Sequence, residues 1–164
     1  MTADFDRDEA YVAYADTLPA YFAYSSALEL VKIGFSSNVR QRLVTIRSDR
    51  PEAGKIALLG WAIGGPQLEA ELHERFSEHR EHGEWFLPAA EMADWLDDNS
   101  EEGEPPIMSS GPFRVSGRGY WAARAHLATT SYQERVVVDF GDGRQLRVRE
   151  FVKPDLVGLP GGAS

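Results

Sequence analysis

Cysteine is absent from this chain of 164 residues, which excludes disulfide bonds, zinc held by thiolates and thiol catalysis. No run of about 18 apolar residues occurs, so we expect no membrane-spanning helix. The segment 1–17 is acidic and lacks the basic start and apolar stretch of a signal peptide. Together these absences predict a cytoplasmic protein.

Positive charge is also scarce, because 17 Lys and Arg face 26 Asp and Glu, for a net charge of −9. Taken alone, this total disfavours a nucleic-acid partner. The charge is unevenly distributed, however. Residues 1–18 and 99–112 have net charges of −4 and −3, whereas residues 32–55 and 113–164 have +4 and +3. A basic patch for phosphate therefore remains compatible with the sequence, although a charge run is more often a solvated face.

Composition also divides the chain into segments. Residues 99–112 are rich in Pro, Gly, Ser and acid and show no periodicity, which is typical of a linker. We therefore predict an acidic N-terminal arm over 1–18, a main domain over 19–98, this linker, and a small β-rich appendage over 113–164 that ends in a flexible tail.

Local patterns predict an α+β main domain. Asn38 is a suitable N-cap for a helix, and Pro66 suits the first turn of another. In the appendage, Asp142-Gly143 lies in a strong hairpin turn. The predicted strands are 21–25, 30–35, 55–63, 135–140 and 145–152, with a short extended piece at 84–87; the predicted helices are 39–47, 66–79 and 89–97; and 120–130 is a third appendage strand or a short helix.

Two charged residues lie where packing alone does not place them. At about 100° per residue, Arg42 and Glu69 each lie roughly 60–65° from the centre of the apolar stripe of their helices. Each is thus at the edge of a buried face. Either the two residues share a half-buried pocket, or they form an interhelical salt bridge.

The order of several motifs resembles the GIY-YIG nuclease core. Tyr21-Phe22-Ala23 is followed by Lys32-Ile33-Gly34, and Arg42 comes eight residues after that glycine. Leu68-Glu69, with Leu72-His73 and Phe76, resembles the metal-binding helix of that family. Gly83-Glu84-Trp85-Phe86 is similar to the box that ends the core in a phage- and bacteria-borne branch. The resemblance covers about 19–97.

The resemblance implies a small three-stranded antiparallel sheet flanked by helices, and an endonuclease that hydrolyses phosphodiester bonds in DNA with one Mg²⁺ or Mn²⁺. Tyr21 matches the tyrosine of the first motif, Arg42 the family arginine and Glu69 the metal-binding glutamate. One carboxylate suits Mg²⁺, which keeps most of its water. An arginine fork fits a phosphate. Tyr21 could act as a base only if nearby cations or the metal lowered its pKa.

The chain departs from the family pattern at several positions. Pro19-Ala20 replaces Gly-Ile of the first motif, Lys32 replaces the tyrosine of the second, and Ile46 lies where many members have His or Tyr. Lys32 could lower the pKa of Tyr21 or hold a phosphate. The expected catalytic set is therefore Tyr21, Lys32, Arg42 and Glu69, with Glu69 as the metal ligand.

Four further cations supply the expected DNA-binding surface, namely Arg40, Arg47, Arg50 and Lys55. The appendage interleaves arginines with aromatic residues. Either these residues stack on bases, or the aromatic residues form the core of the appendage and the arginines lie on its solvated surface. Two alternatives to the nuclease remain: a GIY-YIG-like binding module without catalysis, and a regulatory protein that binds a protein partner.

Overall fold

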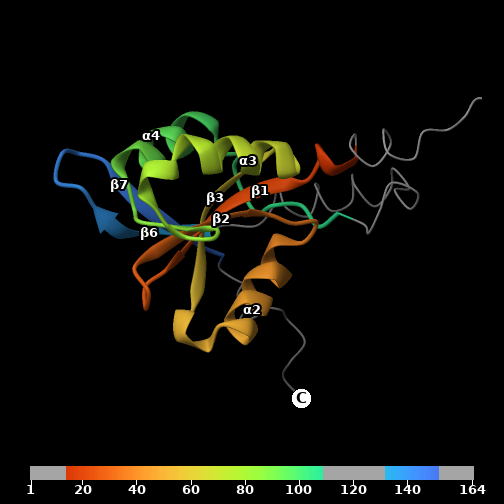
Figure 1. Cartoon of the computed structure of the whole chain (residues 1–164), viewed down its shortest axis with the longest axis horizontal. Coiled ribbons are helices and arrows are strands. Elements are labelled where there is room, and N and C mark those ends of the chain that lie inside the picture. The colour runs from red at the N-terminus through yellow and green to blue at the C-terminus, as the bar shows by residue number, and fades with distance from the viewer. Residues whose placement is uncertain (1–13, 109–131, 152–164) are drawn as a thin grey trace, which may run out of the picture.

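The computed structural model describes residues 14–108 and 132–151, and the predicted segment 120–130 lies outside them. Three α-helices and seven strands in these ranges give an α+β fold (Figure 1), which confirms the predicted class. The strands are β1 (Pro19–Ser25), β2 (Leu30–Phe35), β3 (Ile56–Ile63), β4 (Arg80–His82), β5 (Trp85–Phe86), β6 (Tyr132–Asp139) and β7 (Gln145–Phe151). The helices are α2 (Val39–Asp49), α3 (Gly65–Arg75) and α4 (Ala90–Asn99), with 3₁₀ turns at Pro51–Ala53 and Ser77–His79.

These bounds confirm the local predictions to within a few residues. The Asn38 side chain accepts a hydrogen bond from the Gln41 N–H at 3.1 Å, which is the predicted N-cap of α2. The helix predicted over 66–79 ends earlier, because α3 stops at Arg75 and the chain continues in a 3₁₀ turn. A 3₁₀ turn at a helix end satisfies backbone groups that the α-helix leaves unpaired.

The sheet is larger than the three-stranded sheet that we expected. Its seven strands follow the order β4-β5-β2-β1-β3-β7-β6, and all neighbours are antiparallel. The expected strands β1, β2 and β3 form the centre. Both of their outer edges are extended, by β5 and β4 beside β2 and by β7 and β6 beside β3. An unpaired edge exposes backbone donors and acceptors, and pairing on both sides satisfies them.

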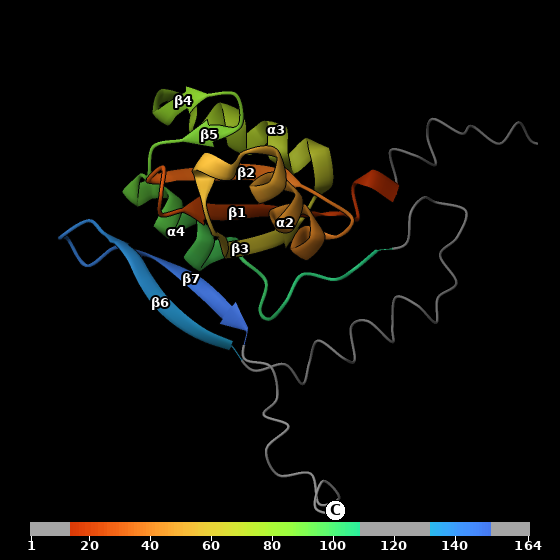
Figure 2. The ribbon, with the colours of Figure 1, turned by 90° about the horizontal axis from the view of Figure 1, so that it is seen from below.

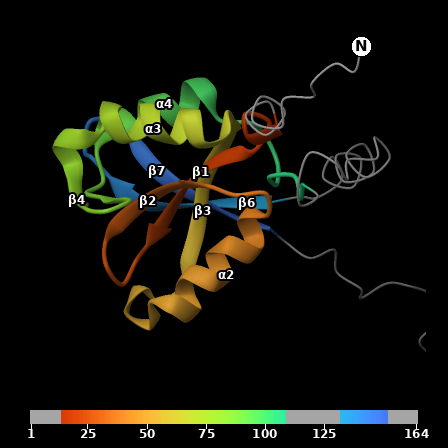
Figure 3. The same cartoon turned by 45° about the vertical axis from the view of Figure 1, so that its right-hand side comes forward.

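Helices cover both faces of the sheet, with α3 and α4 on one side and α2 on the other (Figure 3). Side chains alternate between the two faces along β1. Phe22 therefore packs in the cluster that includes Phe76 and Met92, whereas Tyr21 packs in the cluster that includes Val39 and Trp85. The alternation along β1 therefore sends Phe22 to the side of α3 and α4 and Tyr21 to the side of α2.

The C-terminal hairpin continues the main sheet. β7 pairs with β3 at Leu58 and Arg149, and Leu146 and Val148 are buried in the same cluster as Phe22. Figure 2 shows β6 and β7 running alongside β3. An isolated two-stranded hairpin is at best marginally stable in water. The hairpin predicted from Asp142-Gly143 is thus confirmed, and it derives its stability from the core of the main domain.

Residues 100–108, predicted as part of a linker, are held against the domain. The Glu101 N–H donates to the Trp61 carbonyl at 2.7 Å, and the Trp61 indole N–H donates to the Gly103 carbonyl at 2.9 Å. The Met108 N–H reaches the Ser37 carbonyl at 2.7 Å. We call residues 100–108 the strap.

Within residues 14–108 and 132–151, no helix is both long and apolar enough to cross a membrane.

Candidate functional site

Tyr21 crosses the face of β2 at a glycine. Tyr21 is 1% exposed, and its backbone partner across the sheet is Gly34. A Cβ at position 34 would lie 2.8 Å from the Tyr21 hydroxyl, closer than real Cβ atoms approach. The absence of a side chain at Gly34 therefore lets the phenol pass over β2. The sequence reasoning quoted Gly34 as part of a motif but gave it no role; its position as cross-strand partner of a large aromatic residue was the missing signal.

Arg42 reaches the Tyr21 hydroxyl from α2. Its side chain donates a hydrogen bond to the phenol oxygen, and its positive charge favours the ionised phenol. Burial nevertheless raises the pKa of Tyr21 well above its usual value, and the negative charges of Glu84 and Glu69 raise it further. The lowered pKa that Tyr21 would need to act as a base is not reached in the protein alone, because burial outweighs the effect of Arg42. Tyr21 therefore keeps its proton at neutral pH.

Glu69 approaches the same place from α3. It is half-buried, and its carboxylate accepts a hydrogen bond from the Phe35 N–H at the end of β2. Burial raises the pKa of Glu69, and the negative charge of Glu84 adds to this rise, while His73 and Lys32 oppose it. Arg42 is half-buried as well. Within the described residues these two side chains form no salt bridge with each other, so the interhelical salt bridge is not seen there.

His73 lies one helical turn after Glu69 and ties α3 to the sheet. Its Nε2 is 2.9 Å from the Ile33 carbonyl oxygen, so Nε2 carries the proton and donates. The ring packs at 5.2 Å from that of Phe86. These contacts hold the last turn of α3 against β2 and so help to position Glu69, one turn earlier on the helix.

Lys32 is a buried cation on β2. Its side chain is 6% exposed and forms an ion pair with Glu84, which is 45% exposed. The ammonium also lies 5.6 Å from the ring centroid of Trp85, its backbone partner on β5. Of the two roles considered for Lys32, lowering the pKa of Tyr21 is not among the principal effects on that phenol. The ammonium instead pairs with Glu84 and lowers the pKa of Glu69.

Tyr21, Lys32, Arg42 and Glu69 thus converge from β1, β2, α2 and α3. Arg42, Glu69 and Glu84 act electrostatically on Tyr21, and Lys32 and Glu84 act on Glu69. The sequence reasoning placed Glu84 in the Gly-Glu-Trp-Phe box but did not pair it with Lys32. The spacing gave little signal, because Lys32 and Glu84 are 52 residues apart.

A divalent metal would find one principal carboxylate here. Among the described residues, no group of three or more His, Cys, Asp or Glu side chains is arranged to hold an ion. This excludes a closed zinc-type site from those ranges. Glu69 is half-buried and has a raised pKa, so its negative charge is incompletely balanced. Such a carboxylate fits a Mg²⁺ ion that keeps several waters and takes its other ligands from a phosphate.

The four expected DNA-binding residues differ in their surroundings. Arg40 is paired with Glu104 of the strap at 2.6 Å. Arg50 contacts Glu52 at 3.1 Å and lies 5.8 Å from the Trp85 ring centroid. Arg47 and Lys55 are exposed, and neither has an ion-pair partner within residues 14–108 and 132–151. These last two are the cations most available to an external anion.

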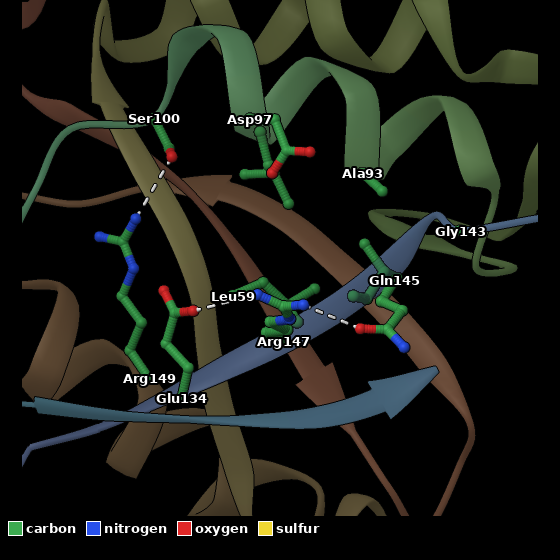
Figure 4. Close-up of a pocket in the computed structure, with 11 residues that line it drawn as sticks. Leu59, Ala93, Asp97, Ser100, Glu134, Gly143, Gln145, Arg147 and Arg149 are labelled. Carbon is green, nitrogen blue, oxygen red and sulfur yellow. Dashed lines mark hydrogen bonds and ion pairs between the residues drawn. The ribbon is translucent and has the colours of Figure 1, made fainter. Parts of the chain in front are cut away.

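A polar pocket of about 140 Å³ lies elsewhere, between α4 and the hairpin (Figure 4). Its arginines are already bonded within the protein. Arg147 contacts Gln145 at 3.0 Å and Glu134 at 3.7 Å, and Arg149 donates to Ser100 at 3.2 Å. The pocket contains none of the converging residues of the candidate site.

The fold and the site define an α+β protein in which a tyrosine, two cations and a half-buried carboxylate meet near the end of a central strand of an antiparallel sheet. The T5orf172 domain matches residues 10–99, more than half of the chain, and the chain belongs to the T5orf172 domain family. This phage-associated domain is related to nuclease folds. No match to the chain was found among curated proteins or among solved structures.

Proposed function

We propose that this protein is a metal-dependent endonuclease of GIY-YIG type that hydrolyses phosphodiester bonds in DNA. The observation that supports this best is the convergence of Tyr21, Lys32, Arg42 and Glu69, which are far apart in sequence. Membership of a nuclease-related family points the same way. A structural salt-bridge network would not need a tyrosine and an arginine hydrogen-bonded at the same point as a half-buried carboxylate.

The cations would bind the scissile phosphate. Arg42 has a planar fork of N–H donors, only part of which the Tyr21 oxygen occupies. Its remaining donors can reach two oxygens of one phosphate. Lys32 adds a second positive charge close to Glu69. Arg47 and Lys55 would contact neighbouring phosphates and contribute affinity that depends on salt.

Tyr21 would orient the attacking water and accept its proton at the phenol oxygen. This requires the pKa of Tyr21 to fall from its raised value. Arg42 already opposes the rise. Glu69 would hold the Mg²⁺ or Mn²⁺ ion, which when bound would stabilise the leaving oxygen and reverse the effect of the Glu69 charge on Tyr21.

The raised pKa of Tyr21 favours one competing function, a nucleic-acid-binding module without catalysis. Such a module would use Arg42, Arg47 and Lys55 to hold phosphates and would leave Tyr21 protonated throughout. It predicts salt-dependent DNA binding with no cleavage in any divalent ion.

Assays of plasmid and single-stranded DNA cleavage, with the wild type and with Glu69→Ala, distinguish the nuclease from the binding module. We expect the wild type to cleave with Mg²⁺ or Mn²⁺ and to stop when the metal is chelated. Glu69→Ala should lose activity by about 100-fold or more, because the metal loses its carboxylate. The matched control is Glu71→Ala on the exposed face of α3, which should cleave like the wild type. Equal cleavage by wild type and Glu69→Ala would refute the assignment.

A further inference from the structure

The ammonium of Lys32 is buried, so its charge needs a partner from another part of the chain. The Lys32 side chain is only 6% exposed, and a buried charge is strongly unfavourable without a partner of opposite charge. The neighbouring strands offer mainly apolar side chains, and the backbone partners of Lys32 are Ala23 on β1 and Trp85 on β5. Glu84 is the carboxylate that forms an ion pair with it. Glu84 is therefore the partner that holds the Lys32 ammonium in place.

Glu84 is itself held by the sheet. The Ile33 N–H donates to the Glu84 carbonyl at 3.1 Å, which places Glu84 beside β2 at the start of β5. Its preceding residue, Gly83, has a φ of +55°, a conformation that glycine adopts at little cost. The turn thereby directs the Glu84 side chain to Lys32, and the Glu84 carboxylate also acts electrostatically on Glu69 and Tyr21.

We propose that Glu84 is a positioning residue that holds the Lys32 ammonium beside Glu69, where Lys32 meets an oxygen of the substrate phosphate. An ammonium has three N–H donors, and the ion pair with Glu84 leaves donors free for that oxygen. The inference rests on the proposed nuclease function. It adds to that function a residue that acts through Lys32 and not by contact with substrate.

A role for Glu84 as a second metal ligand fits the geometry less well. Coordination of a metal would draw its carboxylate away from Lys32 and leave a buried ammonium without its partner, which is strongly unfavourable. The metal ligand is Glu69, whereas Glu84 is already neutralised by Lys32. The two carboxylates thus have separate tasks.

A double-mutant cycle with Glu84→Gln and Lys32→Met tests the proposal by steady-state cleavage of DNA. Glu84→Gln should lower kcat by about 10–100-fold, the usual effect of removing a supporting partner, with KM changed by less than about threefold. In the Lys32→Met background the same change should have almost no further effect. Glu81→Gln, an exposed carboxylate on β4, is the matched control and should cleave like wild type. If the fold-loss of kcat in the double variant equals the product of the two single losses, the proposal is overturned.

A second measurement does not depend on activity. Labelling of lysines with an amine-reactive ester, quantified by mass spectrometry at Lys32, should increase several-fold in Glu84→Gln and stay unchanged in Glu81→Gln. Unchanged labelling in Glu84→Gln means that Glu84 does not hold Lys32, which ends the proposal. If the wild type cleaves no DNA, the proposed nuclease function fails, and the labelling still decides whether Glu84 positions Lys32.

Thermal unfolding of each variant identifies loss of structure. Should Glu84→Gln not fold, Glu84→Asp replaces it, because the charge is kept and only the reach is shorter. Its Lys32 labelling should exceed that of the wild type. Labelling of a folded Glu84→Asp at the wild-type level would overturn the proposal.

Discussion

The α2 side of the molecule and the C-terminal hairpin are both rich in arginine, but their arginines are used differently. The hairpin arginines are all bonded within the described residues. Arg135 pairs with Glu150, Arg144 with Asp142 and Asp94, Arg147 with Glu134, and Arg149 donates to carbonyls of the strap. On the α2 side, Arg47 and Lys55 have no ion-pair partner in those ranges, and Arg42 is bonded to a tyrosine. Net charge along a sequence therefore does not tell which cations can bind an external phosphate.

The difference follows from what each region does for the fold. The hairpin adds two strands to the sheet and buries Leu146 and Val148, and its paired charges lie around these apolar residues. Such half-exposed ion pairs contribute little stability, roughly 0–1 kcal/mol each, but they leave little net charge on the surface. The hairpin arginines are thus bonded to partners within the fold, and a role of the appendage in stacking on bases stays a prediction.

The largest expected effect that separates the two regions is on catalysis. Arg42→Ala should lower kcat for DNA cleavage by about 100–1000-fold, because the phosphate loses its fork of donors and Tyr21 loses the charge that opposes its raised pKa. Arg147→Ala in the hairpin is the matched control and should change kcat by less than about threefold. Comparable losses in both variants, measured under single-turnover conditions, would contradict the distinction.

The second effect is on stability, and here the hairpin should respond. Leu146 is 1% exposed in the shared core, so Leu146→Ala should reduce the free energy of unfolding by about 2–5 kcal/mol. Val44→Ala on the exposed side of α2 should change it by less than about 0.5 kcal/mol. Urea unfolding followed by circular dichroism measures both. A near-neutral Leu146→Ala would show that the hairpin is not part of the cooperative unit.

The third effect is on the salt dependence of DNA binding. The pair Arg47→Ala and Lys55→Ala should reduce the slope of log K against log salt by about 2 for double-stranded DNA, because two phosphate contacts are lost. The pair Arg135→Ala and Arg147→Ala should leave the slope within experimental error. Fluorescence anisotropy at several salt concentrations gives the slopes. A larger change in slope for the hairpin pair would show that DNA binds to the hairpin and not to the α2 side.

The smallest effect concerns Arg40, which the strap partly neutralises. Glu104 is 13% exposed in its side chain and pairs with Arg40 at 2.6 Å. Glu104→Gln should release Arg40 and increase DNA affinity about two- to fivefold, an amount typical of one surface charge. Glu102→Gln, also on the strap, should have less effect. If Glu104→Gln weakened binding, the strap would be supporting the DNA surface and not competing with it.

Much of the local structure could be predicted because its causes lie within a few residues. Asn38 caps α2, and Asp142-Gly143 forms the hairpin turn, each through contacts with near neighbours. The candidate residues Tyr21, Arg42 and Glu69 were found from the order of their motifs and from their positions at the edges of apolar stripes. The structure brings them together, while their catalytic roles stay predictions.

Other features could not be found in this way because they join distant segments. The expected three-stranded sheet omitted the pairing of β7 with β3, which links residues 91 positions apart at Leu58 and Arg149. The condition that Tyr21 needs a lowered pKa could not be checked against its burial, which only the packed tertiary structure produces. The pairing of Glu84 with Lys32 was missed because the two residues are 52 positions apart.

The sequence by itself determined the absence of thiol chemistry, the α+β class, the caps and the turns, because composition and short-range hydrogen bonding suffice for these. The tertiary structure alone decided which strands complete the sheet, which arginines remain available to a phosphate, and which carboxylate balances Lys32. Charge and burial at a site are set by groups that packing brings close from far along the chain. Electrostatic interaction depends on that distance in space and not on separation in sequence.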